Sequence, residues 1–153
     1  DVHFIESPAN PTTLSLQRFF GILETHAPDS LVRNLQAPFM FGVHSATASA
    51  GFLVLRPENY DRTFAGLLAW EPLLVRDLHV ILTGTTPEAT LLSAKWSDAL
   101  IKNVNARVVR DSQGKIALLY AFFDKNTLII TANETAFVEL ITRLTTPRPV
   151  LQK

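Results

Sequence analysis

The sequence contains no cysteine, and this absence excludes several kinds of chemistry. A chain without thiols has no disulfide framework, no thiolate nucleophile and no cysteine-based zinc or iron–sulfur centre. The absence does not decide between an oxidising and a reducing compartment. Any function of this chain must therefore come from other side chains.

An excess of charge of either sign is also lacking. Fourteen Lys and Arg residues balance fourteen Asp and Glu residues. A phosphate backbone is bound by cations gathered on one face, whereas these cations are scattered, so we expect no nucleic acid among the partners. The longest apolar run, residues 65–70, is far shorter than the roughly 18 to 20 residues of a membrane-spanning helix. We expect the chain to be soluble and to reach a membrane only through a segment outside it.

The composition is that of a folded domain. Of 153 residues, 47% are hydrophobic and 18% are charged, which excludes a disordered chain. We expect one domain over residues 14–146, an N-terminal extension or linker over 1–13 and a C-terminal tail over 147–153. The chain begins at Asp1 without Met. Two explanations stay open: a cut after a signal peptide, membrane anchor or other domain, or an arbitrary boundary.

Helical periodicity begins soon after the extension. Apolar residues within 14–25 recur at i, i+3, i+4 and i+7, and Thr12 or Thr13 could cap this amphipathic helix. A short helical piece over residues 31–35 should follow and should end before Pro38. The pattern predicts a two-helix lead-in.

A longer apolar stripe occupies the middle of the chain. Pro57 and Glu58 suit the first turn of a helix, and the stripe continues past Pro72 to a stop at Gly84. Because proline lacks the N–H group that a helix interior needs, Pro72 permits two readings. The segment forms two helices, or one helix kinked at Pro72.

Runs of β-branched and aromatic residues predict an antiparallel sheet. The fourth of the expected strands is apolar on both faces, so it should be central and covered on both sides. Gly114, in the turn before it, lies where a positive φ is needed. We expect about five strands, over residues 39–44, 52–55, 101–110, 116–123 and 127–131.

The last helix and the class of fold follow from this pattern. Thr131 and Glu134 have the spacing of a capping box in front of an apolar stripe. The chain then contains two successions of hairpin and helix, which could be two ββα halves of a duplicated unit or a chance likeness. In either case we predict an α+β domain, with amphipathic helices packed on the sheet.

Motifs for metals and cofactors are not found. The four histidines include no pair at i, i+4 and no HExxH, and the chain has neither a Walker loop nor a GxGxxG motif. We therefore expect no metal and no cofactor.

His44 is the first of three weak candidates for catalysis. It leaves a strand beside Ser45, with Ser49 nearby, so a nucleophile and its base could be drawn here. No GxSxG elbow accompanies it, and a histidine in a solvated hairpin explains the pattern with fewer assumptions.

Glu71 and Asp77 are the other two candidates. Glu71 lies on or near the apolar stripe, where it needs a partner such as Arg107 or a free helix N-terminus, and this favours a structural role. Asp77 and His79 point about 200° apart on a helix, so they cannot share a substrate.

A polar strip is a further possibility. Asn103, Asn105 and Arg107 alternate along a predicted strand, so they should lie on one face of the sheet. They could bind a ligand, or they could form an ordinary solvated face.

Three groups of residues are familiar when they are taken together. They are Phe41-Gly42-Val43-His44, then Phe64-Ala65-Gly66-Leu67-Leu68-Ala69-Trp70-Glu71-Pro72 with Arg76-Asp77-Leu78, then Arg107-Val108, Leu118-Leu119-Tyr120 and Asp124-x-x-Thr127-Leu128-Ile129-Ile130-Thr131. With these residues the chain resembles a bacterial family without an assigned activity. The resemblance spans about residues 14–144 and implies a single-pass membrane protein whose domain of this kind lies outside the cytoplasm. It brings no activity, cofactor or site residue.

The function expected from these observations is not enzymatic. We expect a membrane-anchored interaction or structural domain of the cell envelope, with a protein partner or self-association. The alternative is a hydrolase-like enzyme, or a domain that binds a small ligand or a peptide in a pocket or along an open sheet edge.

Overall fold

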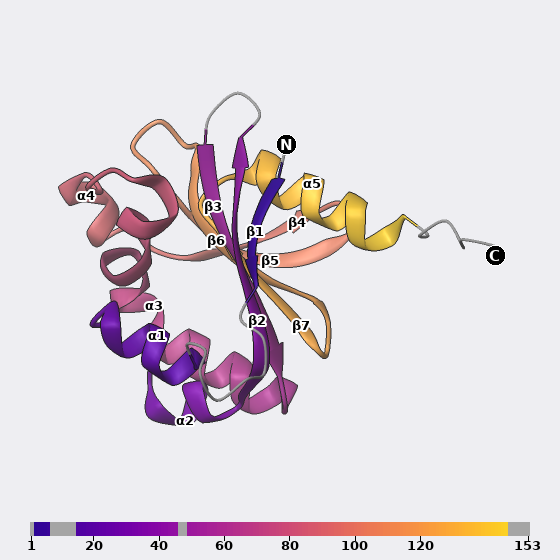
Figure 1. Ribbon diagram of the computed structural model, residues 1–153. Helices are drawn as coiled ribbons and strands as arrows, with labels where there is room; N and C mark the ends of the chain where they lie inside the picture. Colours follow the sequence, from indigo (N-terminus) through magenta and orange to yellow (C-terminus); the bar gives the residue numbers. More distant parts are fainter. Residues whose placement is uncertain (1, 7–14, 46–48, 147–153) are drawn as a thin grey trace.

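The computed structural model describes residues 2–6, 15–45 and 49–146. This part of the chain contains seven strands in one antiparallel sheet, in the order β1-β2-β3-β7-β6-β5-β4, and helices cover both faces (Figure 1). The α+β class is confirmed. The elements are β1 (Val2–Glu6), α1 (Leu16–Ile22), α2 (Asp29–Arg33), β2 (Leu35–Ser45), β3 (Ser49–Pro57), α3 (Tyr60–Thr83), α4 (Ala89–Leu92), β4 (Ser97–Ile101), β5 (Val104–Arg110), β6 (Ile116–Asp124), β7 (Thr127–Thr131) and α5 (Glu134–Thr145).

The sheet separates two hydrophobic cores. Leu53, Leu118 and Tyr120 lie in the core beneath helices α1 to α4. Their strand neighbours Phe52 and Leu119 lie in the core beneath α5. Successive side chains of a strand point to opposite faces, so β3, β6 and β7 supply both cores. The predicted central, doubly covered position of β6 is confirmed.

Two strands were not predicted, and both are at the sheet edges. Val2–Glu6 forms β1, which pairs with the outer edge of β2, so these residues of the expected N-terminal extension belong to the sheet. Apolar residues such as Phe4 and Ile5 suit a strand. The strand was missed because its partner, the outer edge of β2, is distant in the sequence and cannot be recognised from the neighbouring residues. Residues 7–13 lie outside the described residues.

The second unpredicted strand, β4, results from a hairpin without glycine. Residues 101–110 were expected to be one strand, but Lys102 and Asn103 turn the chain with φ angles of 53° and 62°. Positive φ at both central residues is the geometry of a tight two-residue hairpin. Glycine is its usual sign in a sequence, so the turn was missed.

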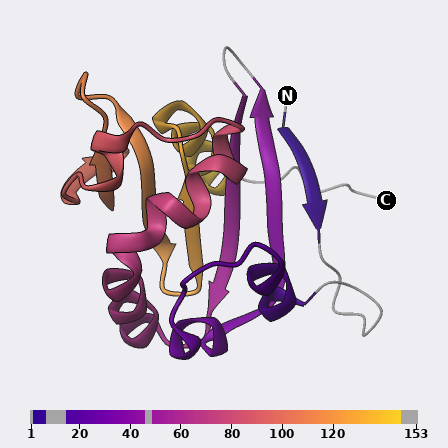
Figure 2. The same cartoon turned by 90° about the vertical axis from the view of Figure 1, so that its left-hand side faces the viewer.

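The middle of the chain forms one helix, α3. It contains Pro72 and ends at Gly84, whose φ of 75° confirms the predicted stop. Figure 2 shows the helix changing direction partway along its length, as expected where proline removes a main-chain hydrogen bond. The predicted start was early, because Pro57 still belongs to β3 and Asn59 caps the helix by accepting from the N–H of Arg62.

The other helix starts also differ from prediction by a few residues. Ser15 caps α1, whereas Thr12 and Thr13 lie outside the described residues. Asn133 caps α5. Thr131 ends β7 and donates its hydroxyl hydrogen to the Gly51 carbonyl instead of forming a capping box. Asn133, two residues further on, takes the N-cap position because Thr131 is still part of β7 and because asparagine is among the preferred N-cap residues.

The two hairpin–helix successions are present but are not arranged alike. Between β3 and β7, Leu53 lies opposite Ile130 and Leu55 lies opposite Leu128, as a local two-fold relation between the strands requires. Such a relation would place both helices on one face of the sheet. Instead α3 covers one core and α5 covers the other (Figure 1). The local symmetry therefore stops at the strands.

Candidate functional site

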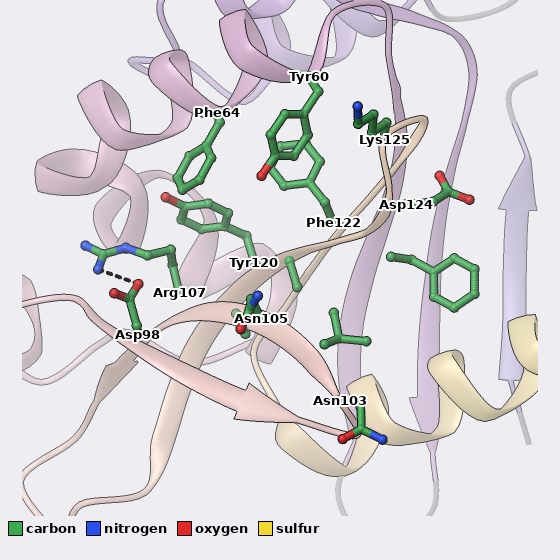
Figure 3. A pocket seen from close by; sticks show the side chains of 14 residues that line it. Tyr60, Phe64, Asp98, Asn103, Asn105, Arg107, Tyr120, Phe122, Asp124 and Lys125 are labelled. Carbon is green, nitrogen blue, oxygen red and sulfur yellow. Dashed lines mark hydrogen bonds and ion pairs between the residues drawn. The ribbon is translucent and has the colours of Figure 1, made fainter.

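A cleft opens where β5 and β6 part. The ladder between these strands ends at Ala106 and Ala121. Beyond that point β6 continues along β7 to Asp124, with a register shift, whereas β5 turns into β4. Bulges and parting strands recur next to binding sites because they expose main chain and redirect side chains. The cleft has a volume of about 440 Å³ and is shown in Figure 3.

One wall of the cleft is aromatic. Tyr60 and Phe64 stand one turn apart at the start of α3, and Phe122 is near the end of β6. The ring centroids of Tyr60 and Phe122 are 4.6 Å apart, and those of Phe64 and Phe122 are 5.9 Å apart. In Figure 3 these rings lie together close to α3. All three are partly exposed, so they offer apolar surface to a ligand.

The opposite side of the cleft is polar. Asn103, Asn105, Arg107 and Asp98 line it. The predicted polar strip therefore does line one cleft, although Asn103 belongs to the turn before β5 and not to the strand. Asp98, on the neighbouring strand, was not singled out from the sequence because its register opposite Arg107 depends on the missed hairpin.

Glu71 does not itself line the cleft, but it holds two side chains that do, Arg107 and Tyr120. Arg107 donates from Nε to Oε1 of Glu71 over 2.8 Å and from Nη2 to Oε2 over 2.9 Å. The Tyr120 hydroxyl donates to the same Oε1 over 2.7 Å. Arg107 is the partner predicted for Glu71, and this prediction is confirmed. A two-pronged guanidinium–carboxylate contact fixes the orientation of both groups.

The surroundings of Tyr120 keep its hydroxyl group protonated. Burial raises the pKa of the Tyr120 hydroxyl well above its ordinary value, and the hydrogen bond to Glu71 raises it further. The same carboxylate, by hydrogen bonding, raises the pKa of Arg107. A tyrosine in this state donates a hydrogen bond and does not serve as a base or nucleophile near neutral pH.

Trp96 and Asp98 complete the surroundings of Glu71. The indole Nε1 of Trp96 donates to the main-chain carbonyl of Glu71 over 3.1 Å, and its ring lies 5.5 Å from that of Tyr120. Asp98 accepts from Nη1 of Arg107 over 3.1 Å. The main-chain carbonyl of Glu71, the residue before Pro72, thereby gains a hydrogen-bond donor from outside the helix. The group is a cross-link between α3 and the sheet.

Asp77 belongs to a separate network on α3. Its carboxylate is only 2% exposed and accepts from Trp70 Nε1 and from the main-chain N–H of His26, each over 2.6 Å. The His26 ring lies 2.8 Å from the other carboxylate oxygen. Asp77 thus ties the segment between α1 and α2 to α3. Its partner was not foreseen, since only the three-dimensional fold brings residues 51 positions apart together.

Glu71 and Asp77, two of the three candidate catalytic residues, do not form one site. Glu71 faces Arg107 and Tyr120, and Asp77 faces His26 and Trp70. The main chain of His44 lies in β2 opposite Ala50, and its side chain lies outside what is described. His79 is buried and contacts the Thr85 carbonyl, apart from Asp77 as predicted. Within residues 15–45 and 49–146, no group of three or more acidic or histidine side chains could hold a metal ion.

The comparisons with known proteins give no relative. No family model matches the chain, and neither a curated protein nor a solved structure matches it. Among the described helices, none has the length and apolar character needed to cross a membrane. The class of protein defined by fold and site is an α+β domain with one aromatic and amide-lined cleft.

Proposed function

We propose that this chain is a non-enzymatic interaction domain that binds an extended segment of another protein in the cleft. The observation that carries the proposal is the meeting of three features there: two parting strands, an amide-bearing side and an aromatic wall. The amides of Asn103 and Asn105 both donate and accept hydrogen bonds, as the peptide groups of a ligand do. Phe64 and Phe122 offer apolar surface for one of its side chains.

The charges around the cleft favour a segment without a strong net charge. Arg107 and Lys125 are balanced by Asp98 and Asp124. Arg107 is also held by Glu71, so little of its charge is free to attract an anion. We therefore expect recognition through main-chain hydrogen bonds and one apolar or aromatic side chain.

The state of the candidate catalytic groups supports a binding role. Both carboxylate oxygens of Glu71 already accept strong hydrogen bonds. Asp77 is buried among donors. Groups held in this way act as cross-links, because a base or nucleophile must reach the reacting atom.

A selection of phage-displayed random peptides on the purified domain tests the proposal. We expect peptides with one large apolar residue, whose affinity falls about tenfold for Asn105→Ala, the effect of losing one hydrogen bond worth about 1.4 kcal/mol. Gln113→Ala removes an exposed amide at the other end of β5 and β6, so it should leave the affinity unchanged. Selected peptides that bind Asn105→Ala and wild type alike would refute the cleft as the site.

Turnover by the same protein would support the hydrolase alternative. Generic esterase, phosphatase and glycosidase substrates provide this check, with Glu71→Gln as the variant. We expect rates equal to the uncatalysed background for both proteins. A wild-type rate that Glu71→Gln abolishes, with the fold intact by circular dichroism, would replace the binding function with an enzymatic one.

We also propose that the domain is membrane-anchored and lies outside the cytoplasm, in the cell envelope. The support is the family resemblance carried by residues 41–44, 64–72 and 107–131. The anchor would be a segment outside this chain. Proteolysis of cells whose cytoplasmic membrane is intact tests the location: added protease should cleave the domain, whereas protection equal to that of a cytoplasmic marker would contradict it.

A further inference from the structure

The strand β4 forms an open end of the sheet. Within the described residues, its only strand neighbour is β5. The turn between the two strands has two residues, so the flanking pair, Ile101 and Val104, exchanges main-chain hydrogen bonds. Main-chain groups alternate in direction along a strand. Asp98 and Leu100 therefore direct their N–H and C=O groups outward, away from β5.

The side chain of Leu100 is exposed at this open edge. It is 67% exposed, the highest value among the large apolar side chains described. It lies opposite Asn105, on the face of the sheet that carries Asp98 and Arg107. Natural sheets protect such edges with charges, proline or bulges. The one charged side chain within β4, Asp98, accepts a hydrogen bond from Arg107 but is 87% exposed, so its charge stays open to a cation on a pairing strand.

We propose that a second copy of this chain pairs antiparallel with the outer edge of β4, with Leu100 opposite the partner's Leu100. A two-fold axis at this position makes the contact self-complementary. It places Asp98, two residues before Leu100, opposite the partner's Lys102, two residues after it, so opposite charges meet twice. The outward N–H and C=O groups of Leu100 then gain partners in those of the partner's Leu100.

The proposed contact between two copies of β4 lies next to the cleft. Asp98 lines the cleft and also lies on β4, so the second copy would stand at the rim of the binding site. The two sheets would become one, with a cleft on each side of the axis. A second copy is favoured over an unrelated strand because the order acid, leucine and base along residues 98–102 is complementary in charge to the same segment running in the opposite direction.

Single cysteines test this arrangement directly, because the chain has none of its own. Leu100→Cys should be joined into a covalent dimer by a short bismaleimide, since opposite Cα atoms of such a pair are about 5.5 Å apart. Leu144→Cys is the matched control: it replaces another exposed leucine, on α5, that is 45% exposed. It should stay monomeric under the same conditions. Equal cross-linking of the two variants would overturn the proposal.

Sedimentation equilibrium on the wild-type chain supplies a second readout. We expect a concentration-dependent dimer that Leu100→Arg converts to monomer and that Leu144→Arg leaves intact. Lys102→Glu should weaken the dimer by up to about thirtyfold, because the two-fold contact loses two exposed ion pairs, each worth up to about 1 kcal/mol. A wild-type chain that is monomeric throughout the concentration series, or a dimer unaffected by Leu100→Arg, would show the proposal to be wrong. Peptide binding in the cleft is measured separately, so either idea can fail alone.

Discussion

At the scale of single residues, two acidic side chains in the interior of α3 serve as cross-links. Glu71 joins α3 to the sheet through Arg107 and Tyr120, and Asp77 joins it to the lead-in helices through His26. A partly buried carboxylate loses hydration, and it is stable here because each oxygen has a strong donor. Removing the charge of Glu71 while keeping the shape of its side chain should therefore lower the free energy of unfolding.

We expect Glu71→Gln to lower the free energy of unfolding by about 2 kcal/mol, because it leaves Arg107 without its main counter-charge in a partly buried site. Glu139→Gln provides the matched control. It breaks the exposed ion pair with Arg143 on α5, so it should cost less than about 0.5 kcal/mol. Urea unfolding of both variants decides the matter, and equal losses would contradict a structural role for Glu71.

Alkaline pH should reveal the buried hydroxyl of Tyr120. Its pKa in the folded chain is raised by burial and by Glu71, whereas in the unfolded chain the hydroxyl has its ordinary pKa of about 10. Stability from this group is therefore full below about pH 10 and is lost as the pH rises further. In Tyr60→Phe, Tyr120 is the only tyrosine. Tyrosinate absorbance should appear only together with loss of the circular dichroism of the fold, and its earlier appearance would refute the burial effect.

At the scale of elements, the packing of α2 against α3 depends on Gly66. A Cβ atom at this position would lie 2.8 Å from Cβ of Leu31, a side chain that is 1% exposed. Gly21, in α1, has no neighbouring atom within 4 Å of such a Cβ. The two helical glycines thus separate the effect of helix propensity from the effect of close packing.

We expect Gly21→Ala to raise the free energy of unfolding by about 0.5 to 1 kcal/mol, since alanine loses less conformational entropy in a helix. Gly66→Ala should lower it by about 1 to 3 kcal/mol, because α2 must move away from α3. Thermal and urea unfolding measure both changes. The same sign for the two variants would show that packing at Gly66 does not decide the outcome.

Elements were predicted best where a pattern is local. The Gly84 stop, the turn with Gly114 and the apolar face of β6 can be recognised from neighbouring residues alone. The β4 hairpin could not, because Lys102 and Asn103 adopt positive φ without glycine. The partner of Glu71 was found from the need to neutralise a buried charge, whereas the His26 partner of Asp77 depends on how distant helices pack.

At the scale of the whole molecule, the two cores are coupled through shared strands. Leu118 lies in one core and Leu119 in the other, so β6 cannot leave one core and remain in the other. Both tryptophans, Trp70 and Trp96, belong to the core beneath α3. Their fluorescence therefore reports on one side of the sheet only.

We expect Leu140→Ala, on α5, to lower the free energy of unfolding by about 2 to 5 kcal/mol, because it leaves a cavity where the side chain is 5% exposed. The tryptophan fluorescence transition should shift by the same amount as the circular dichroism transition, although no tryptophan lies on that side. A fluorescence midpoint unchanged from wild type would mean that the two cores unfold separately.

The pairing of β3 with β7 has a consequence for the chain as it leaves the ribosome. Thr131 and Gly51, which meet at this junction, are 80 positions apart in the sequence. Until β7 is synthesised, the edge of β3 has no partner while Phe52 and Leu53 present apolar surface to either side. A nascent chain in this state is open to association with its neighbours on the same messenger. Translation pauses after Gly84 should therefore lower the yield of folded protein more than pauses after Thr131.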